Sequence, residues 1–110
     1  MKPIQWLGDS RDRLRRFPQA VRRDIGYQLS LVQAGYSAND WKPIPAVGAG
    51  VIEIRVHAGA EYRVFYVAKF EGAIYVLHVF GKKTRKASTL DVELGKKRYR
   101  ELLERRKRCE

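Results

Sequence analysis

Arginine, lysine and tyrosine recur in the middle of the chain at positions that predicted strands would bring together. The set comprises Arg55, Arg63, Tyr66, Lys82 and Lys83. An arginine guanidinium is planar and always charged, so it can hold a phosphate and neutralise charge that develops on it. Lysine or tyrosine can transfer a proton when neighbouring cations lower its pKa. These residue types suit the metal-free cleavage of RNA, in which the RNA's own 2′-hydroxyl is the nucleophile.

Other catalytic chemistries lack the residues that they need. Two-metal nucleases hold their cations with clustered acids, but Glu53, Glu61 and Glu71 are scattered at predicted strand ends and turns. The segment VGAGV lacks the lysine of a phosphate-binding loop. The only cysteine, Cys109, stands beside the last residue, so it forms no disulfide within the chain and no metal site. We therefore expect no metal and no cofactor.

Charge and composition narrow the class of protein. The 110 residues have a net charge of +11 and are 45% hydrophobic, which fits one folded domain over residues 1–110. Residues 82–110 hold 12 basic and five acidic side chains. This basic segment favours a polyanionic partner, although a helix with a solvated basic face is the alternative. We expect a cytoplasmic protein, because there is no long apolar run, no signal peptide and no pair of cysteines.

The spacing of apolar residues predicts an α+β fold with an antiparallel sheet and helices packed on one side. A short strand over 3–7 is followed by a helical hairpin over 10–34, in which apolar residues recur at helical spacing. Residues 36–50 contain two prolines and no period, so we expect a loop. Three strands joined by short turns follow, at 51–57, 61–70 and 74–80. A helix over 89–107 completes the order β-α-α-β-β-β-α.

Alternation within the first hairpin sets its register. Pairing residue 56 with 62, 54 with 64 and 52 with 66 places apolar residues opposite one another. The same register places Arg55 directly opposite Arg63 on the other face. Two arginines side by side repel each other unless an anion lies between them. An ion pair with Glu53 accounts for one of them but not easily for both.

The register of the second hairpin has two alternatives, which differ in the residues that share a face with Arg63. If residue 70 pairs with 74, Lys83 lies on that face. If residue 70 pairs with 73, Lys82 and His78 lie there instead. A slip of one residue exchanges every side chain between the two faces.

The central block of the chain resembles the RelE superfamily of bacterial toxins, and within it the HigB-type, phage-protein-like branch. The pattern of that branch is matched in order by KPI (42–44), the glycines 48 and 50, EIR (53–55), YR with a later Tyr (62–66), and LH with Phe and two lysines (77–83). The match covers about residues 42–88, and the flanking helices agree in order and length only. The family fold has the same order of elements that the apolar spacing predicts.

This resemblance implies the toxin of a type II toxin–antitoxin pair, a metal-independent endoribonuclease that binds the ribosomal A site and cuts the mRNA there. It implies that Arg63 holds the scissile phosphate and that Arg55 makes a nearby contact. Lys82 or Lys83 would stabilise charge or transfer a proton, and Arg85 and Lys86 of the basic cluster would contact RNA. The implied partners are the ribosome, mRNA and a cognate antitoxin, a HigA-like helix-turn-helix protein.

The general acid and base stay open. Several relatives carry a tyrosine or histidine shortly after the basic cluster, whereas TRKAST (84–89) has neither, and Tyr99 is the only later candidate. His78 and Tyr66 are catalytic candidates whose alternative role is packing in the core, and His57 stands beside a turn. The missing late residue favours a second hypothesis, a non-cleaving RNA- or ribosome-binding protein that inhibits translation. A third is an interaction protein whose basic face binds an acidic partner.

Overall fold

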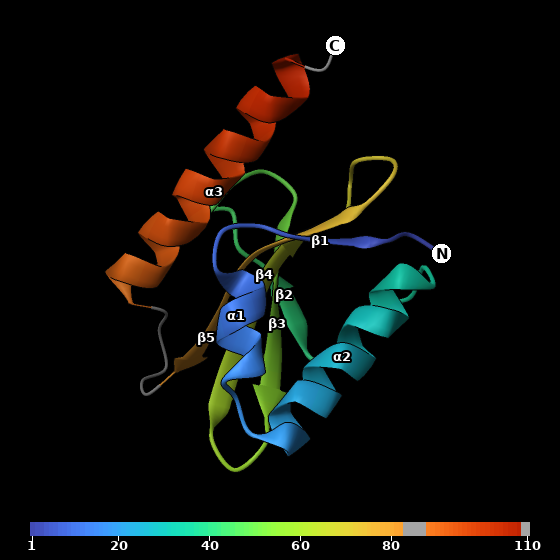
Figure 1. The fold of residues 1–110 in the computed structure, drawn as a ribbon, viewed down its shortest axis with the longest axis vertical. Coiled ribbons are helices and arrows are strands. Elements are labelled where there is room, and N and C mark those ends of the chain that lie inside the picture. The colour runs from blue at the N-terminus through green and yellow to red at the C-terminus, as the bar shows by residue number, and fades with distance from the viewer. Residues whose placement is uncertain (83–87, 109–110) are drawn as a thin grey trace.

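A computed structural model describes residues 1–82 and 88–108, which form one five-stranded sheet and three helices (Figure 1). The strands are β1 (Ile4–Trp6), β2 (Trp41–Pro43), β3 (Val51–His57), β4 (Glu61–Val67) and β5 (Ile74–Lys82). The helices are α1 (Ser10–Arg15), α2 (Gln19–Gln33) and α3 (Thr89–Arg108). The α+β class is confirmed, and the predicted order of elements is followed apart from the additional strand β2. No helix in this part of the chain is long and apolar enough to cross a membrane.

The sheet is mixed, with the strand order β1-β5-β4-β3-β2. The strands from β2 to β5 pair antiparallel, but β1 lies parallel to β5, with Ile4 opposite Ile74. The sequence predicted antiparallel pairs only. Short turns dictate antiparallel neighbours. No short turn joins β1 to β5, because α1, α2 and three other strands separate them along the chain. The direction of this edge strand was therefore not encoded in any hairpin.

The predicted loop over 36–50 contains a strand, which corrects the sequence analysis. Strand β2 pairs with β3 so that Trp41 lies opposite Ile54 and Pro43 opposite Ile52. All three of its residues are exposed, so the strand has no buried face that would produce alternation in the sequence. Proline is tolerated here because β2 is an edge strand, in which a missing backbone N–H can face solvent.

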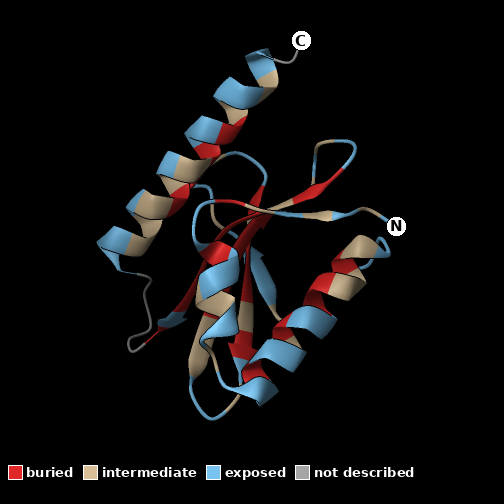
Figure 2. Cartoon of the chain, viewed as in Figure 1, coloured by how far each residue is buried: buried red, intermediate tan, exposed pale blue. Residues whose placement is uncertain are grey.

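Alternate residues of the central strands build two hydrophobic clusters. The first joins α2 to one face of the sheet through residues such as Ile25, Val64 and Val76. The second joins α3 to the opposite face of the sheet through strand residues such as Phe65 and Leu77. Helix α2 and, through Leu14, helix α1 thus pack on one side of the sheet, as predicted. Helix α3 packs against the second cluster. Figure 2 shows the buried residues along the strands and on the inner sides of the helices.

The register of the first hairpin is confirmed, with Ile54 opposite Val64 and Arg55 opposite Arg63. In the second hairpin Glu61 lies opposite Lys82 and Arg63 opposite Phe80, which is the register of the second alternative. An irregularity between Phe65 and Tyr66 shifts the remaining pairs by one residue. A β-bulge of this kind inserts one unpaired residue into a strand and changes which side chains face each layer.

Helix α3 begins at a side-chain cap formed by Ser88 and Asp91. The Ser88 Oγ atom accepts a hydrogen bond from the Asp91 backbone N at 3.1 Å and donates one to Asp91 Oδ2 at 2.6 Å. Gly95, which lowers helix propensity, lies where the helix meets the sheet. A Cβ atom there would stand 3.0 Å from both Phe65 and Val47. The glycine therefore permits the close approach of α3 to the second cluster.

Candidate functional site

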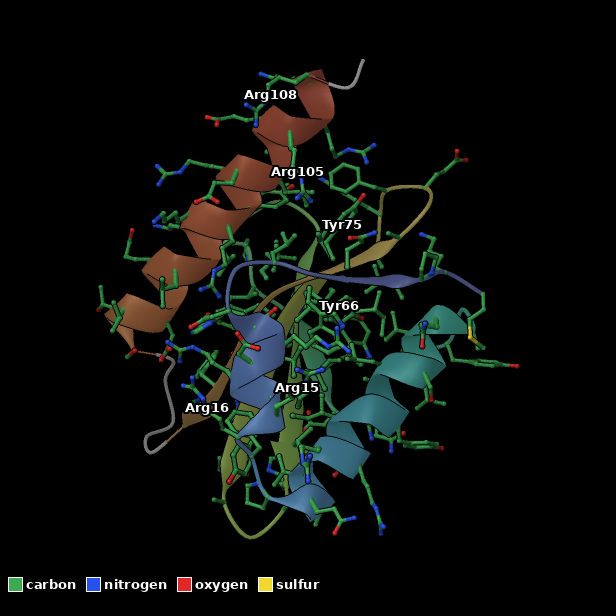
Figure 3. All side chains as sticks on the ribbon, viewed as in Figure 1. Arg15, Arg16, Tyr66, Tyr75, Arg105 and Arg108 are labelled. Atoms are coloured by element: carbon green, nitrogen blue, oxygen red, sulfur yellow. The ribbon has the colours of Figure 1, made fainter. Side chains whose placement is uncertain are left out.

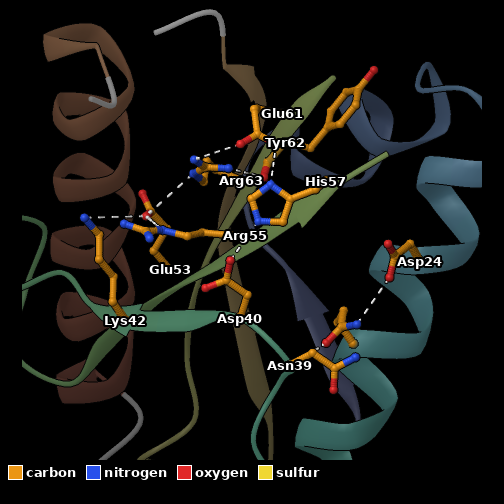
Figure 4. A network of polar contacts seen from close by, with 11 residues as sticks. Asp24, Asn39, Asp40, Lys42, Glu53, Arg55, His57, Glu61, Tyr62 and Arg63 are labelled. Atoms are coloured by element: carbon orange, nitrogen blue, oxygen red, sulfur yellow. Dashed lines mark hydrogen bonds and ion pairs between the residues drawn. The ribbon is translucent and has the colours of Figure 1, made fainter. Parts of the chain in front are cut away.

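Five residues form what we call the Glu53 cluster: Lys42, Glu53, Arg55, Arg63 and Lys82. Glu53 is 1% exposed, and three cations lie close to the Oε1 atom of its carboxylate (Figure 4). The Arg55 Nε atom lies 3.3 Å away, the Arg63 Nε atom 3.7 Å and the Lys42 Nζ atom 4.0 Å. A buried carboxylate is retained when opposite charges compensate for its lost hydration, so the ion pairs explain why Glu53 can lie inside the fold.

Strand pairing places these side chains together. Glu53 and Arg55 are alternate residues of β3 and therefore share a face, which is the face that α3 covers further along the sheet. Lys42 of β2 lies opposite Glu53, and Arg63 of β4 lies opposite Arg55. Lys82 reaches the same face through its place opposite Glu61. Four strands thus each contribute to one charged patch.

Arg63 is the most enclosed cation of the cluster, with 5% of its surface exposed. Its Nη1 atom donates to the Tyr62 carbonyl oxygen at 3.0 Å, and its Nη2 atom lies 3.9 Å from Glu61 Oε1. The buried Nε atom has no hydrogen-bond acceptor within the described residues. A buried donor without an acceptor is energetically costly. The other contacts of the guanidinium hold Arg63 in place, while its Nε–H group makes no hydrogen bond within the described residues.

Lys82 is the member of the cluster best suited to proton transfer. Its side chain is largely buried, and burial lowers the pKa of its ammonium group. The positive charge of Arg63 lowers this pKa further, while the charge of Glu53 acts in the opposite direction. A lysine whose pKa falls toward neutrality gives up its proton more readily, which is what a general acid or base requires.

The contact of Glu53 with both arginines corrects the expectation that it accounts for only one of them. The two guanidinium groups approach the same carboxylate oxygen. They differ in access, since the Arg55 side chain is 31% exposed and that of Arg63 only 6%. Glu53 therefore relieves the repulsion between the paired arginines without an external anion, and Arg55 is the more accessible of the two.

Tyr66 lies away from this cluster. It belongs to the hydrophobic cluster between the sheet and α2 (Figure 3). Arg63 is an odd-numbered residue of the same strand, so it lies on the opposite face, across from Arg55. Burial raises the pKa of its phenol, which makes deprotonation harder. The structure thus places Tyr66 in the packing role that the sequence left open as its alternative.

His78 shares the face of Arg63 but is fully buried beneath α3. Its Nε2 atom lies 2.8 Å from Asp91 Oδ1, and the Arg98 Nη1 atom donates to its Nδ1 atom at 3.4 Å. Burial lowers the pKa of the imidazole, so the neutral form is favoured. The ring also stacks on Phe80 with centroids 4.9 Å apart. His78 therefore anchors α3 to β5 and has no path to solvent.

The remaining sequence candidates have the following places. The Tyr99 hydroxyl donates to the Ala49 carbonyl oxygen at 2.7 Å, and its ring is buried against Gly48. Lys83, Arg85 and Lys86 lie outside the described residues. In the part of the chain that the structure describes, no group of His, Cys, Asp or Glu side chains is placed to hold a metal ion.

Sequence reasoning missed two parts of the site. Lys42 was read only as part of a family motif, because β2 was not predicted, and its position opposite Glu53 depends on that strand. The second part is the contacts of His57, a residue that the sequence analysis named only as standing beside a turn. Its Nε2 atom lies 2.7 Å from Asp40 Oδ2 and its Nδ1 atom 2.5 Å from Glu61 Oε2 (Figure 4). The four-residue spacing of His57 and Glu61 across a tight turn was the signal that could have found this contact.

Comparison with known proteins gives one match. The sequence model of the family described as phage derived protein Gp49-like (DUF891) matches residues 12–100, which includes the whole sheet except β1. No curated protein matches the chain.

Proposed function

Because the chain belongs to the Gp49-like family of phage-derived proteins, a RelE-like toxin family, we propose that it is the toxin of a type II toxin–antitoxin pair. We assign it to the HigB-type branch and propose that it cleaves translated mRNA in the ribosomal A site. The Glu53 cluster is the observation that carries this proposal. It places the half-buried Arg55, the enclosed Arg63 and a lysine of lowered pKa on one face.

The proposed reaction uses the RNA as its own nucleophile. The 2′-oxygen attacks the adjacent phosphorus, the bond to the 5′-oxygen of the next nucleotide breaks, and the products are a 2′,3′-cyclic phosphate and a 5′-hydroxyl. The 2′-hydroxyl loses one proton and the departing 5′-oxygen gains one. Arg55 and Arg63 would stabilise the added negative charge on the phosphate, because their donors are fixed before the reaction begins. Lys82 would carry one of the protons.

Dependence on the ribosome would account for the sparse set of proton-transfer groups. A ribosome that holds the mRNA in a fixed path orients the reacting groups, and this orientation can remove a large part of the activation barrier. The net charge of +11 supports binding to ribosomal RNA, since cationic surfaces release counterions from nucleic acid. The proposed antitoxin, a HigA-like helix-turn-helix protein, would need acidic groups or steric bulk to block this surface in the cytoplasm.

A non-cleaving protein that binds RNA or the ribosome and inhibits translation is the second candidate. It is favoured by the positions of Tyr66, His78 and Tyr99, each of which is buried in a structural contact. Among the described residues, Lys82 is the one sequence-predicted proton-transfer group that reaches the Glu53 cluster. Binding alone would require only the cations.

Primer extension on an mRNA incubated with purified protein, with and without 70S ribosomes, separates these candidates. Cuts that appear only with ribosomes are expected. Cuts on naked RNA would retain the nuclease and remove the ribosome from its mechanism. Cosedimentation with ribosomes in the absence of any cut would favour the non-cleaving binder.

A further inference from the structure

His57 forms a bridge between two carboxylates at the edge of the Glu53 cluster. Asp40 precedes β2 and Glu61 begins β4, so the imidazole connects two elements besides its own strand. The Asp40 carbonyl oxygen also accepts from the Arg55 backbone N at 2.9 Å. His57, Glu61 and the turn between them line a hollow of about 340 Å³, so the bridge is open to solvent.

The geometry of the bridge indicates the charge of the imidazole. Both ring nitrogens lie within hydrogen-bond distance of carboxylate oxygens. A neutral imidazole has one N–H group, and its other nitrogen would then direct a lone pair at an anion. The doubly protonated form donates to both carboxylates. The pKa of His57 is accordingly raised, first by the hydrogen bond to Asp40 and then by that to Glu61.

Glu61 stands between this imidazole and Arg63. Its Oε2 atom accepts from His57, while its Oε1 atom lies 3.9 Å from Arg63 Nη2, too far for a hydrogen bond. Lys82 lies opposite Glu61 on β5. When His57 loses its proton, one of the two carboxylates loses its donor. Asp40 is still tied to β3 through its backbone, and Glu61 has Arg63 close by.

We propose that protonated His57 is a positioning residue that holds Glu61 beyond hydrogen-bond distance in its 3.9 Å ion pair with Arg63 and so keeps that arginine available to RNA phosphate. This inference rests on the proposed function, because it assumes that Arg63 faces RNA. Loss of the proton releases Glu61 to close its 3.9 Å ion pair with Arg63 to a hydrogen bond, and it removes one positive charge beside the cluster. RNA affinity therefore falls as the pH rises through the pKa of His57.

Fluorescence anisotropy with a short labelled 2′-O-methyl RNA, which cannot be cleaved, tests the proposal. Wild-type affinity should fall about two- to fivefold across the His57 transition, the range expected for one exposed ion pair. The His57→Gln variant should show the weaker affinity at all pH values, without the transition. The double variant His57→Gln, Glu61→Gln should regain the stronger affinity, because the competing carboxylate is gone. Glu71→Gln, an exposed change in the β4–β5 turn, is the matched control and should bind as wild type does.

Two outcomes would overturn the proposal: a transition that persists in His57→Gln, or a double variant no tighter than the single one. The absence of RNA binding at every pH would also overturn it. NMR titration of the His57 ring reports the bridge itself, and its pKa should fall in Glu61→Gln. Failure of the proposed function would give a different result: the RNA affinity would be unchanged in Arg63→Ala, while the NMR titration would still show the bridge.

Discussion

Arg55 and Arg63 lie directly opposite each other on adjacent strands, and both guanidinium groups approach the same oxygen of the buried Glu53 carboxylate. This arrangement holds two like charges side by side without a bound anion. It also makes the carboxylate structurally necessary, because its removal leaves the enclosed Arg63 without its nearest countercharge.

Glu53→Gln should therefore destabilise the protein. The amide keeps the shape of the side chain but removes the charge that compensates for Arg55 and Arg63. We expect a decrease of about 1–3 kcal/mol in the free energy of unfolding, the usual penalty for leaving a buried polar group poorly paired. Urea denaturation measures this change. Glu71→Gln in an exposed turn is the control, and an equal stability for both variants would show that the ion pairs contribute nothing.

Gly95→Ala and Gly26→Ala should change stability in opposite directions. Both glycines lie within helices, but a Cβ atom at position 95 would stand 3.0 Å from the buried Phe65 and Val47 side chains. At position 26 nothing lies within 4 Å. We expect Gly95→Ala to lower the free energy of unfolding by about 1–3 kcal/mol through overpacking. Gly26→Ala should raise it by about 0.5–1 kcal/mol through helix propensity. Thermal unfolding of both variants would contradict this account if Gly95→Ala were the more stable.

The two histidines should impose opposite pH dependences on stability. Burial lowers the pKa of His78 below 6.5, so the unfolded chain binds more protons just below that pH and stability rises with pH there. The pKa of His57 is raised above 6.5, so its contribution is complete below 6.5 and is lost as the pH rises through the folded value.

The His57→Gln variant isolates the effect of His78. Its free energy of unfolding should rise with pH toward 6.5 and then level off, as measured by urea denaturation from about pH 5 to pH 8. The further substitution His78→Asn should remove this rise. A His57→Gln protein whose stability falls over the lower part of this range would contradict the burial of a neutral His78.

The sequence was sufficient to predict the central hairpins, because their alternation is strong. Apolar residues such as Ile54 and Val64 can face the core in only one register, and that register fixes Arg55 opposite Arg63. The choice between the two registers of the second hairpin depended on a bulge beside Phe65. A bulge leaves no trace in apolar alternation when both faces of a strand are buried, as they are in β4 and β5.

Other features depend on contacts that a sequence pattern does not contain. Strand β2 has no buried face, and the parallel pairing of β1 has no connecting turn, so neither produced a signal. Glu53 resembles an outward-facing residue in an alternating strand, yet it is buried because α3 and three cations surround that face. Tyr66 and His78 had the right chemistry, and only the packing of α2 and α3 shows that both are enclosed.

The most direct test of the central claim compares Arg63→Lys with Arg23→Lys in ribosome-dependent primer extension. Both changes keep the positive charge, but Arg63 belongs to the Glu53 cluster and Arg23 is exposed on α2. Lysine lacks the planar fork that binds two phosphate oxygens. Circular dichroism should first show that both variants are folded. We predict that cleavage is lost in Arg63→Lys and unchanged in Arg23→Lys, and full cleavage by folded Arg63→Lys would contradict the assignment of this cluster to RNA phosphate.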